Sequence, residues 1–159
     1  MMTLYHGSHV EVTAPDVSFS RDNLDFGKGF YVTPIFEQAC SWAERFKRRK
    51  GTAVVSKYEL ASVALSGDTQ MLIFDGYTEA WLDFIIACRS GKPSGDYEVI
   101  VGGIANDKVF DTVQLYLDGL VDKEQAIKRL RYDKPNMQYC LRDQSLIDKY
   151  LTFASSEVI

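Results

Sequence analysis

The chain has 159 residues, with a formal net charge of -4, 46% hydrophobic residues and 25% charged residues, so a single domain over residues 1–159 is expected. The acidic balance excludes a global positive field that would collect nucleic-acid backbones, although a local basic cleft still admits a nucleic-acid end or loop. The three cysteines form no C-x-x-C pair and no segment has the pattern of a membrane span or an export signal, so we expect free thiols, a cytoplasmic setting and no membrane partner.

The first part of the chain predicts a strand, a loop, a turn and a second strand. Residues 3–5 begin a short β-type run, and residues 12–22 contain a proline and no periodicity, which indicates a surface loop. The Gly-Lys-Gly sequence at residues 27–29 predicts a tight turn. Residues 30–32 are aromatic and β-branched, so they predict a strand directly after that turn.

A helix is expected over residues 34–50, because apolar side chains recur there every three or four residues. Thr33 is expected to be its N-cap and Pro34 its first residue. The basic run at residues 47–50 is expected to end this helix, where cations offset the negative end of the macrodipole.

The rest of the chain mixes strands and helices without a regular alternation. The expected strands are residues 52–60, 70–74, 96–102, 137–141 and 151–154. The expected helices are residues 78–88 with Thr78 as N-cap, 111–117, 122–130 and 143–150. This order favours an α+β domain built around antiparallel sheets over a doubly wound fold.

Three short motifs carry the functional signal. Residues 4–8 read Leu-Tyr-His-Gly-Ser, residues 25–31 read Asp-Phe-Gly-Lys-Gly-Phe-Tyr, and residues 136–143 read Asn-Met-Gln-Tyr-Cys-Leu-Arg-Asp. In this order they resemble the three signature strands of the poly(ADP-ribose) polymerase branch of the ADP-ribosyltransferase superfamily. The order is also similar to that of small bacterial ADP-ribosyltransferase-like toxins of toxin-antitoxin pairs. The resemblance implies a split β-sandwich of two antiparallel sheets with flanking helices, and NAD as a substrate without a metal.

The resemblance also implies a role for each matching residue. His6 would bond a ribose hydroxyl on the adenosine side of NAD, and Gly7 would clamp the nicotinamide carboxamide through its backbone, an approach that a side chain would block. Tyr31 would stack on the nicotinamide ring, with Trp42 on the opposite face, since aromatic walls suit a flat cationic ring. Arg21 would bind the pyrophosphate. The NAD-binding residues expected are His6, Gly7, Ser8, Arg21, Gly29, Tyr31 and Trp42.

The third motif departs from the family pattern at its first functional position. The family ordinarily has a catalytic glutamate there, whereas this chain has Gln138, so the expected catalytic residues are His6, Tyr31 and Gln138. The amide oxygen of Gln138 can accept the ribose 2′-OH hydrogen bond but carries no charge, which favours mono-ADP-ribosyl transfer or hydrolysis over chain elongation. Another carboxylate could substitute, and the candidates are Glu98, Asp96 and Asp143.

Simpler interpretations exist for each residue taken singly. His6 alone fits a buried structural histidine, and Tyr31 and Trp42 alone fit core aromatics; together with the glycine turn they favour a ligand site. A metal pair of His6 and His9 is disfavoured, because their odd spacing on a strand directs them to opposite faces. The glycine turn also precedes a strand, whereas a phosphate loop follows one.

The leading functional hypothesis is an NAD-dependent ADP-ribosyltransferase that modifies a protein or nucleic-acid acceptor, as a bacterial toxin with a small antitoxin partner. Aromatic residues between Tyr77 and Phe84 are expected to be exposed for such a partner. Gln138 motivates an alternative, a catalytically silent module that binds NAD or ADP-ribose. A third alternative is an RNA phosphotransferase that shares the architecture of this superfamily and binds RNA in a salt-dependent way.

Overall fold

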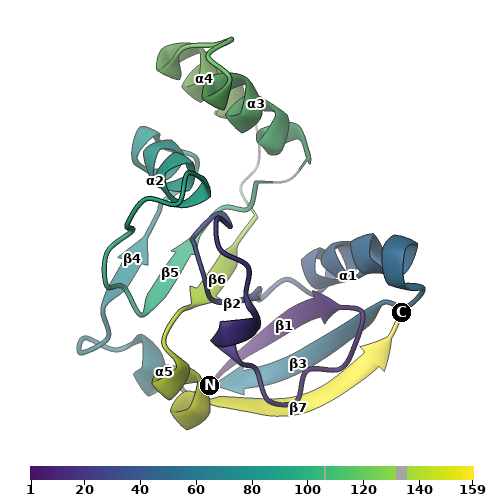
Figure 1. Ribbon diagram of the computed structural model, residues 1–159. Helices are drawn as coiled ribbons and strands as arrows, with labels where there is room; N and C mark the ends of the chain where they lie inside the picture. The colour runs from purple at the N-terminus through teal and green to yellow at the C-terminus, as the bar shows by residue number, and fades with distance from the viewer. Residues whose placement is uncertain (106, 132–135) are drawn as a thin grey trace.

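The first β-sheet joins the beginning and the end of the chain. In the computed structural model, which describes residues 1–105, 107–131 and 136–159, strands β1 (Met2–Ser8), β3 (Val54–Leu60) and β7 (Leu151–Val158) pair in the antiparallel order β1-β3-β7 (Figure 1). The expected strands at both ends of the chain are confirmed. Strand β7 continues past residue 154, because its pairing with β3 extends to Val54 opposite Val158.

The second sheet contains four strands and includes one parallel pair. Its order is β2-β6-β5-β4, formed by β2 (Phe30–Val32), β6 (Gln138–Leu141), β5 (Val99–Gly102) and β4 (Met71–Ile73). Strand β6 is antiparallel to both β2 and β5, but β4 and β5 run parallel. The α+β class is confirmed, whereas the expectation of two purely antiparallel sheets is wrong. The reason is that helix α2 (Glu79–Arg89) connects β4 to β5 as a crossover, which returns the chain in the same direction.

One pair of residues links the two sheets, Tyr5 in β1 and Thr33 directly after β2. Tyr5 and Thr33 exchange two backbone hydrogen bonds of 2.8 and 2.9 Å. The Thr33 hydroxyl donates to the carbonyl of Met137 at 2.7 Å, so Thr33 belongs to the β structure. The expectation that Thr33 caps the first long helix is therefore wrong: α1 (Phe36–Lys50) begins after Ile35, which makes no side-chain cap bond.

The other helices begin close to their expected starts, with one exception. Thr78 accepts a bond from the backbone of Trp81 at the start of α2, as expected. Asp122 caps α4 (Lys123–Leu130) and Asp143 caps α5 (Gln144–Tyr150), and each is the first residue of the range expected for its helix. Helix α3 (Asp107–Leu117) begins earlier than expected. The short turns η1 (Val17–Phe19) and η2 (Ser62–Leu65) complete the chain. No helix in the described part of the chain has the length and apolarity needed to cross a membrane.

Three apolar clusters hold these elements together. The first lies between the two sheets and contains Leu4, Tyr58, Leu60, Val99 and Leu141. The second lies between the four-stranded sheet and helices α2, α3 and α4, and contains Trp81, Ile85, Ile100, Val113 and Leu130. The third lies under α1 and contains Ala39, Ala43 and Val55. Burying each large side chain contributes roughly 1.5–3 kcal/mol, so the clusters fix the sheets and α1 relative to one another.

Candidate functional site

An open cleft of about 1060 Å³ lies where the two sheets and α1 meet. The loop between β1 and β2 contributes to its walls, as do β1, α1, β2 and the start of β6. The structure brings all the sequence-predicted site residues together in this cleft. They are His6, Gly7, Ser8, Arg21, Gly29, Tyr31, Trp42 and Gln138. Residues more than a hundred positions apart in the sequence therefore line one cavity.

His6 is held as a neutral ring with a defined tautomer. Its Nδ1 lies 2.7 Å from the carbonyl oxygen of Tyr31, and because a carbonyl only accepts, Nδ1 carries the proton. Burial lowers the pKa of His6 below its usual 6.5, an effect that the bond to Tyr31 only partly offsets. The ring therefore presents Nε2 as a hydrogen-bond acceptor.

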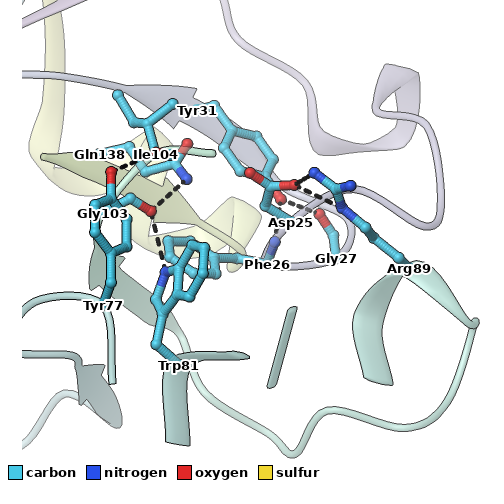
Figure 2. Close-up of polar contacts among 10 residues, drawn as sticks. All are labelled: Asp25, Phe26, Gly27, Tyr31, Tyr77, Trp81, Arg89, Gly103, Ile104 and Gln138. Atoms are coloured by element: carbon cyan, nitrogen blue, oxygen red, sulfur yellow. Dashed lines mark hydrogen bonds and ion pairs between the residues drawn. The ribbon is translucent and has the colours of Figure 1, made fainter. Parts of the chain in front are cut away.

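Tyr31 anchors the glycine turn to β2. Its hydroxyl donates to the carbonyl of Gly27 at 2.5 Å and accepts from the backbone N–H of Phe26 at 2.9 Å (Figure 2). Burial raises the pKa of Tyr31 well above its usual 10.0. The hydroxyl thus stays protonated and already has partners on both sides. The chemical contribution that Tyr31 can make to a ligand is the face of its ring.

Gly7 is a glycine because α1 packs directly on β1. A Cβ atom at this position would lie 2.0 Å from the carbonyl oxygen of Ala39 and 2.7 Å from the nitrogen of Ala43. The expected reason for this glycine, access for a ligand to the backbone, is therefore not the one that the packing gives. The Cβ atom would point at the helix and not into open space.

The backbone of Gly7 still faces the edge of β1 that borders the cleft. Tyr5 directs its N–H and C=O toward Thr33, which directly follows β2, and backbone groups two residues apart point to the same side of a strand. Continuing this antiparallel register places Gly7 opposite Tyr31, and both residues line the cleft. The cleft thus opens between β1 and β2, just beyond the bridge that joins them.

Gln138 lies at the bottom of the cleft and is 4% exposed. Its Nε2 donates to the carbonyl of Gly103 at 3.3 Å, and the same carbonyl accepts from Nε1 of Trp81 at 3.2 Å. Figure 2 shows the Gly103 oxygen between the amide and the indole, with the Gln138 oxygen turned away from it. Gln138 therefore offers a neutral acceptor.

The remaining expected residues occupy different parts of the wall. Trp42 is half-buried on α1, and Ser8 is buried at the end of β1. Arg21 is exposed in the loop. Gly29 donates its N–H to the Ser20 hydroxyl at 3.1 Å, and a Cβ there would lie 2.5 Å from the sulfur of Cys140, so this glycine is also set by packing.

The carboxylates proposed to replace the missing glutamate lie outside the cleft. Glu98 and Asp143 line a smaller pocket of about 260 Å³, where Asp143 caps α5, and Asp96 lines neither cavity. Within the described residues, the carboxylates that line the cleft are Glu11, Asp16 and Asp25. The structure therefore does not bring the three candidates together with Gln138.

An ion pair in the cleft wall escaped the sequence analysis. Nε and Nη2 of Arg89 bond one carboxylate oxygen of Asp25 at 3.0 and 2.6 Å, and both side chains are largely buried (Figure 2). The guanidinium also lies 4.6 Å from the ring centre of Phe110 on α3. Asp25 precedes the glycine turn, but nothing in the sequence around Arg89 marks it as its partner.

Two other expectations concern histidines and exposed aromatics. His6 packs on Phe30 and His9 on Phe46, which lie on opposite faces of β1. No group of three histidine, cysteine or acidic residues among the described positions could hold a metal ion. The expectation of exposed aromatics between Tyr77 and Phe84 is wrong, because Tyr77 is 8% and Trp81 0% exposed in the core under α2.

Comparison with known proteins identifies one family. A family model described as "Protein of unknown function (DUF3990)" matches residues 2–153. No curated protein and no solved structure matches the chain.

Proposed function

This chain belongs to the DUF3990 family, and we propose that it is an NAD-dependent mono-ADP-ribosyltransferase with the split β-sandwich of that superfamily. One observation carries the proposal: six residues of three separate motifs line a single cleft, together with Arg21 and Trp42. Its volume of about 1060 Å³ is at the upper end of what ligand pockets usually offer, as an extended dinucleotide requires.

The chemistry of the cleft suits the two ends of NAD. Nε2 of His6 is an acceptor for a ribose hydroxyl, and the backbone N–H and C=O of Gly7 suit the carboxamide of nicotinamide. The rings of Tyr31 and Trp42 offer aromatic faces to the cationic pyridinium. Arg21 supplies a guanidinium for the pyrophosphate.

The reaction would break the bond between the nicotinamide nitrogen and the ribose. The bonding electrons leave with nicotinamide, and the positive charge that develops on the ribose is quenched by an oxygen or nitrogen of the acceptor, which then loses a proton. Gln138 would hold the ribose 2′-OH through its amide oxygen. Because this oxygen carries no full charge, we expect slow turnover and a single ADP-ribose unit per acceptor.

Nicotinamide release from NAD by the purified protein tests this function. We expect sustained release that falls at least about tenfold in His6→Ala and Tyr31→Ala, since each loses a contact to the ribose or the ring. Tyr116→Ala on α3, outside the residues that line the cleft, is the matched control and should retain release. Labelled NAD added to cell lysate then identifies the acceptor as protein or nucleic acid.

A second candidate is a silent module that binds NAD or ADP-ribose without turnover. The observation that favours it is the neutral amide of Gln138, which stands where the superfamily ordinarily has its catalytic glutamate and is hydrogen-bonded to the Gly103 carbonyl. Tight NAD binding by calorimetry without nicotinamide release would establish this candidate and contradict the transferase.

A bacterial toxin role in the cytoplasm, with a small antitoxin protein as partner, belongs to the same proposal. It rests on the order of the three motifs, which is similar to that of the toxins of toxin-antitoxin pairs. Expression of the chain alone should slow bacterial growth, and His6→Ala should relieve this effect. Co-expression with the product of a neighbouring gene should shift the protein in size-exclusion chromatography, and an unchanged elution volume would contradict the partner.

A further inference from the structure

We propose that position 138 is built to hold a neutral amide, and that the Gly103 carbonyl and the Trp81 indole are positioning groups that direct the Gln138 oxygen into the cleft. The inference deepens the proposed function, on which its ligand-binding part rests. It concerns the residue that decides between turnover and silent binding. Its structural part stands on hydrogen bonds that are present without any ligand.

The Gly103 carbonyl dictates which end of the amide faces it. A carbonyl oxygen has lone pairs only, so its neighbour at position 138 must donate a hydrogen bond. Gln138 meets this requirement through Nε2 at 3.3 Å. Because Gln138 is 4% exposed, bulk water does not compensate for the wrong group there.

The carbonyl is also held so that it cannot turn away. Trp81, at 0% exposure, donates to it from α2 at 3.2 Å. A Cβ on Gly103 would lie 2.5 Å from the ring of Tyr77, whose hydroxyl donates to the next carbonyl, that of Ile104, at 2.7 Å. Gly102 pairs with Gln138 across β5 and β6. The Gly103 carbonyl oxygen is therefore held in place by contacts from α2 and from the four-stranded sheet.

This arrangement disfavours an ionised carboxylate at position 138. A glutamate side chain in the same conformation would bring a carboxylate oxygen against the Gly103 oxygen, where two acceptors repel. It could remain in place only by binding a proton, which raises its pKa. The neutral amide fills two roles: its NH2 group donates to the Gly103 carbonyl, and its oxygen remains free to accept from a sugar hydroxyl.

The unfolding equilibrium of Gln138→Glu at pH 8 and pH 5 tests this without any ligand. When folding raises the pKa of a carboxyl group, the protein loses stability as pH rises. The Gln138→Glu variant should therefore be destabilised more at pH 8 than at pH 5. The folded-to-unfolded ratio, relative to wild type, should fall about tenfold for each unit of raised pKa. Gln138→Met, which cannot ionise, should lose the same factor at both pH values.

The comparison with wild type cancels the contribution that other titratable groups make to the pH dependence of stability. The histidine, acidic and tyrosine side chains that line the same cleft are His6, His9, Glu11, Asp16, Asp25 and Tyr31. They are present in both proteins. Equal relative stability of Gln138→Glu at pH 5 and pH 8 would overturn the proposal.

Trp81→Phe tests the positioning role of the indole, because it removes the N–H and keeps an aromatic ring. Freed of this bond, the Gly103 carbonyl can rotate, so the pH 8 penalty of Gln138→Glu should shrink severalfold in the Trp81→Phe background. Additive effects would contradict the role of Trp81. The Gln138→Met comparison remains decisive if the double variant does not fold.

Ligand measurements separate this inference from the proposed function. At pH 8, nicotinamide release by Gln138→Glu should not exceed that of wild type, and a rise would show that the site accepts a carboxylate. If wild type neither binds nor cleaves NAD, the proposed function fails. The pH-dependent unfolding of Gln138→Glu would still decide whether position 138 selects an amide.

Discussion

Gly7 shows how the close approach of a helix to a strand can require a residue without a side chain. The backbone of α1 lies so close to β1 that Gly7→Ala places a methyl group 2.0 Å from the Ala39 carbonyl. We expect this variant to lose about 3 kcal/mol of stability, or roughly 6–12 °C in Tm. Gly67→Ala is the matched control, because a Cβ there meets nothing within 4 Å. Thermal unfolding of the two variants compares them directly, and similar Tm values would contradict the close contact.

His6 connects pH to stability. Its pKa in the folded protein lies below the usual 6.5, because burial disfavours the charged ring. Protonation therefore favours the unfolded chain: the contribution of His6 to stability is fully present above pH 6.5 and is lost as pH falls toward the folded pKa.

The variant His6→Asn tests this linkage, since it keeps a donor for the Tyr31 carbonyl and does not titrate. We expect the stability of wild type to fall more steeply than that of His6→Asn between pH 7 and pH 5, as measured by urea unfolding. His9 is retained in both proteins. Parallel curves would mean that His6 titrates alike in the folded and unfolded chains.

At the scale of elements, the ion pair between Asp25 and Arg89 fastens the glycine turn to the end of α2. Arg89→Met should cost about 3 kcal/mol, because it leaves a carboxylate without its partner in a site where both side chains are 15–18% exposed. It should also weaken NAD binding, since the turn carries one wall of the cleft. Lys123→Met, which removes exposed ion pairs to Glu79 and Asp83 on the same helix, is the control and should change stability little. Chemical denaturation measures the free energy of unfolding of both variants. Equal losses of stability would contradict the role of the ion pair in holding the glycine turn to α2.

Local sequence patterns predicted most elements, and their failures have physical causes. Thr33 followed by proline fits a helix cap, but pairing with Tyr5 and the bond to Met137 are long-range interactions that no local pattern contains. The direction of β4 was missed for a similar reason, because it depends on the crossover through α2.

For the whole molecule, the cleft was predictable where its residues have distinctive chemistry. His6, Gly7 and Tyr31 belong to short motifs of unusual composition, and all three line the cleft. Trp81, Arg89 and Gly103 lie in stretches without a motif. Arg89 lines the cleft, and Trp81 and Gly103 support Gln138, only because α2 packs on the four-stranded sheet. The sequence therefore predicted residues that line the cleft but not the groups that support them.

The sheet formed by the two ends of the chain has a practical consequence for assays. The Ile159 backbone bonds that of Ala53, and its carbonyl accepts from Lys47 at the end of α1, so an affinity tag placed after Ile159 would emerge beside a wall of the cleft. The amino group of Met1 donates instead to Ser62, at the opposite end of the same sheet (Figure 1). A tag at the amino terminus therefore leaves the mouth of the cleft open.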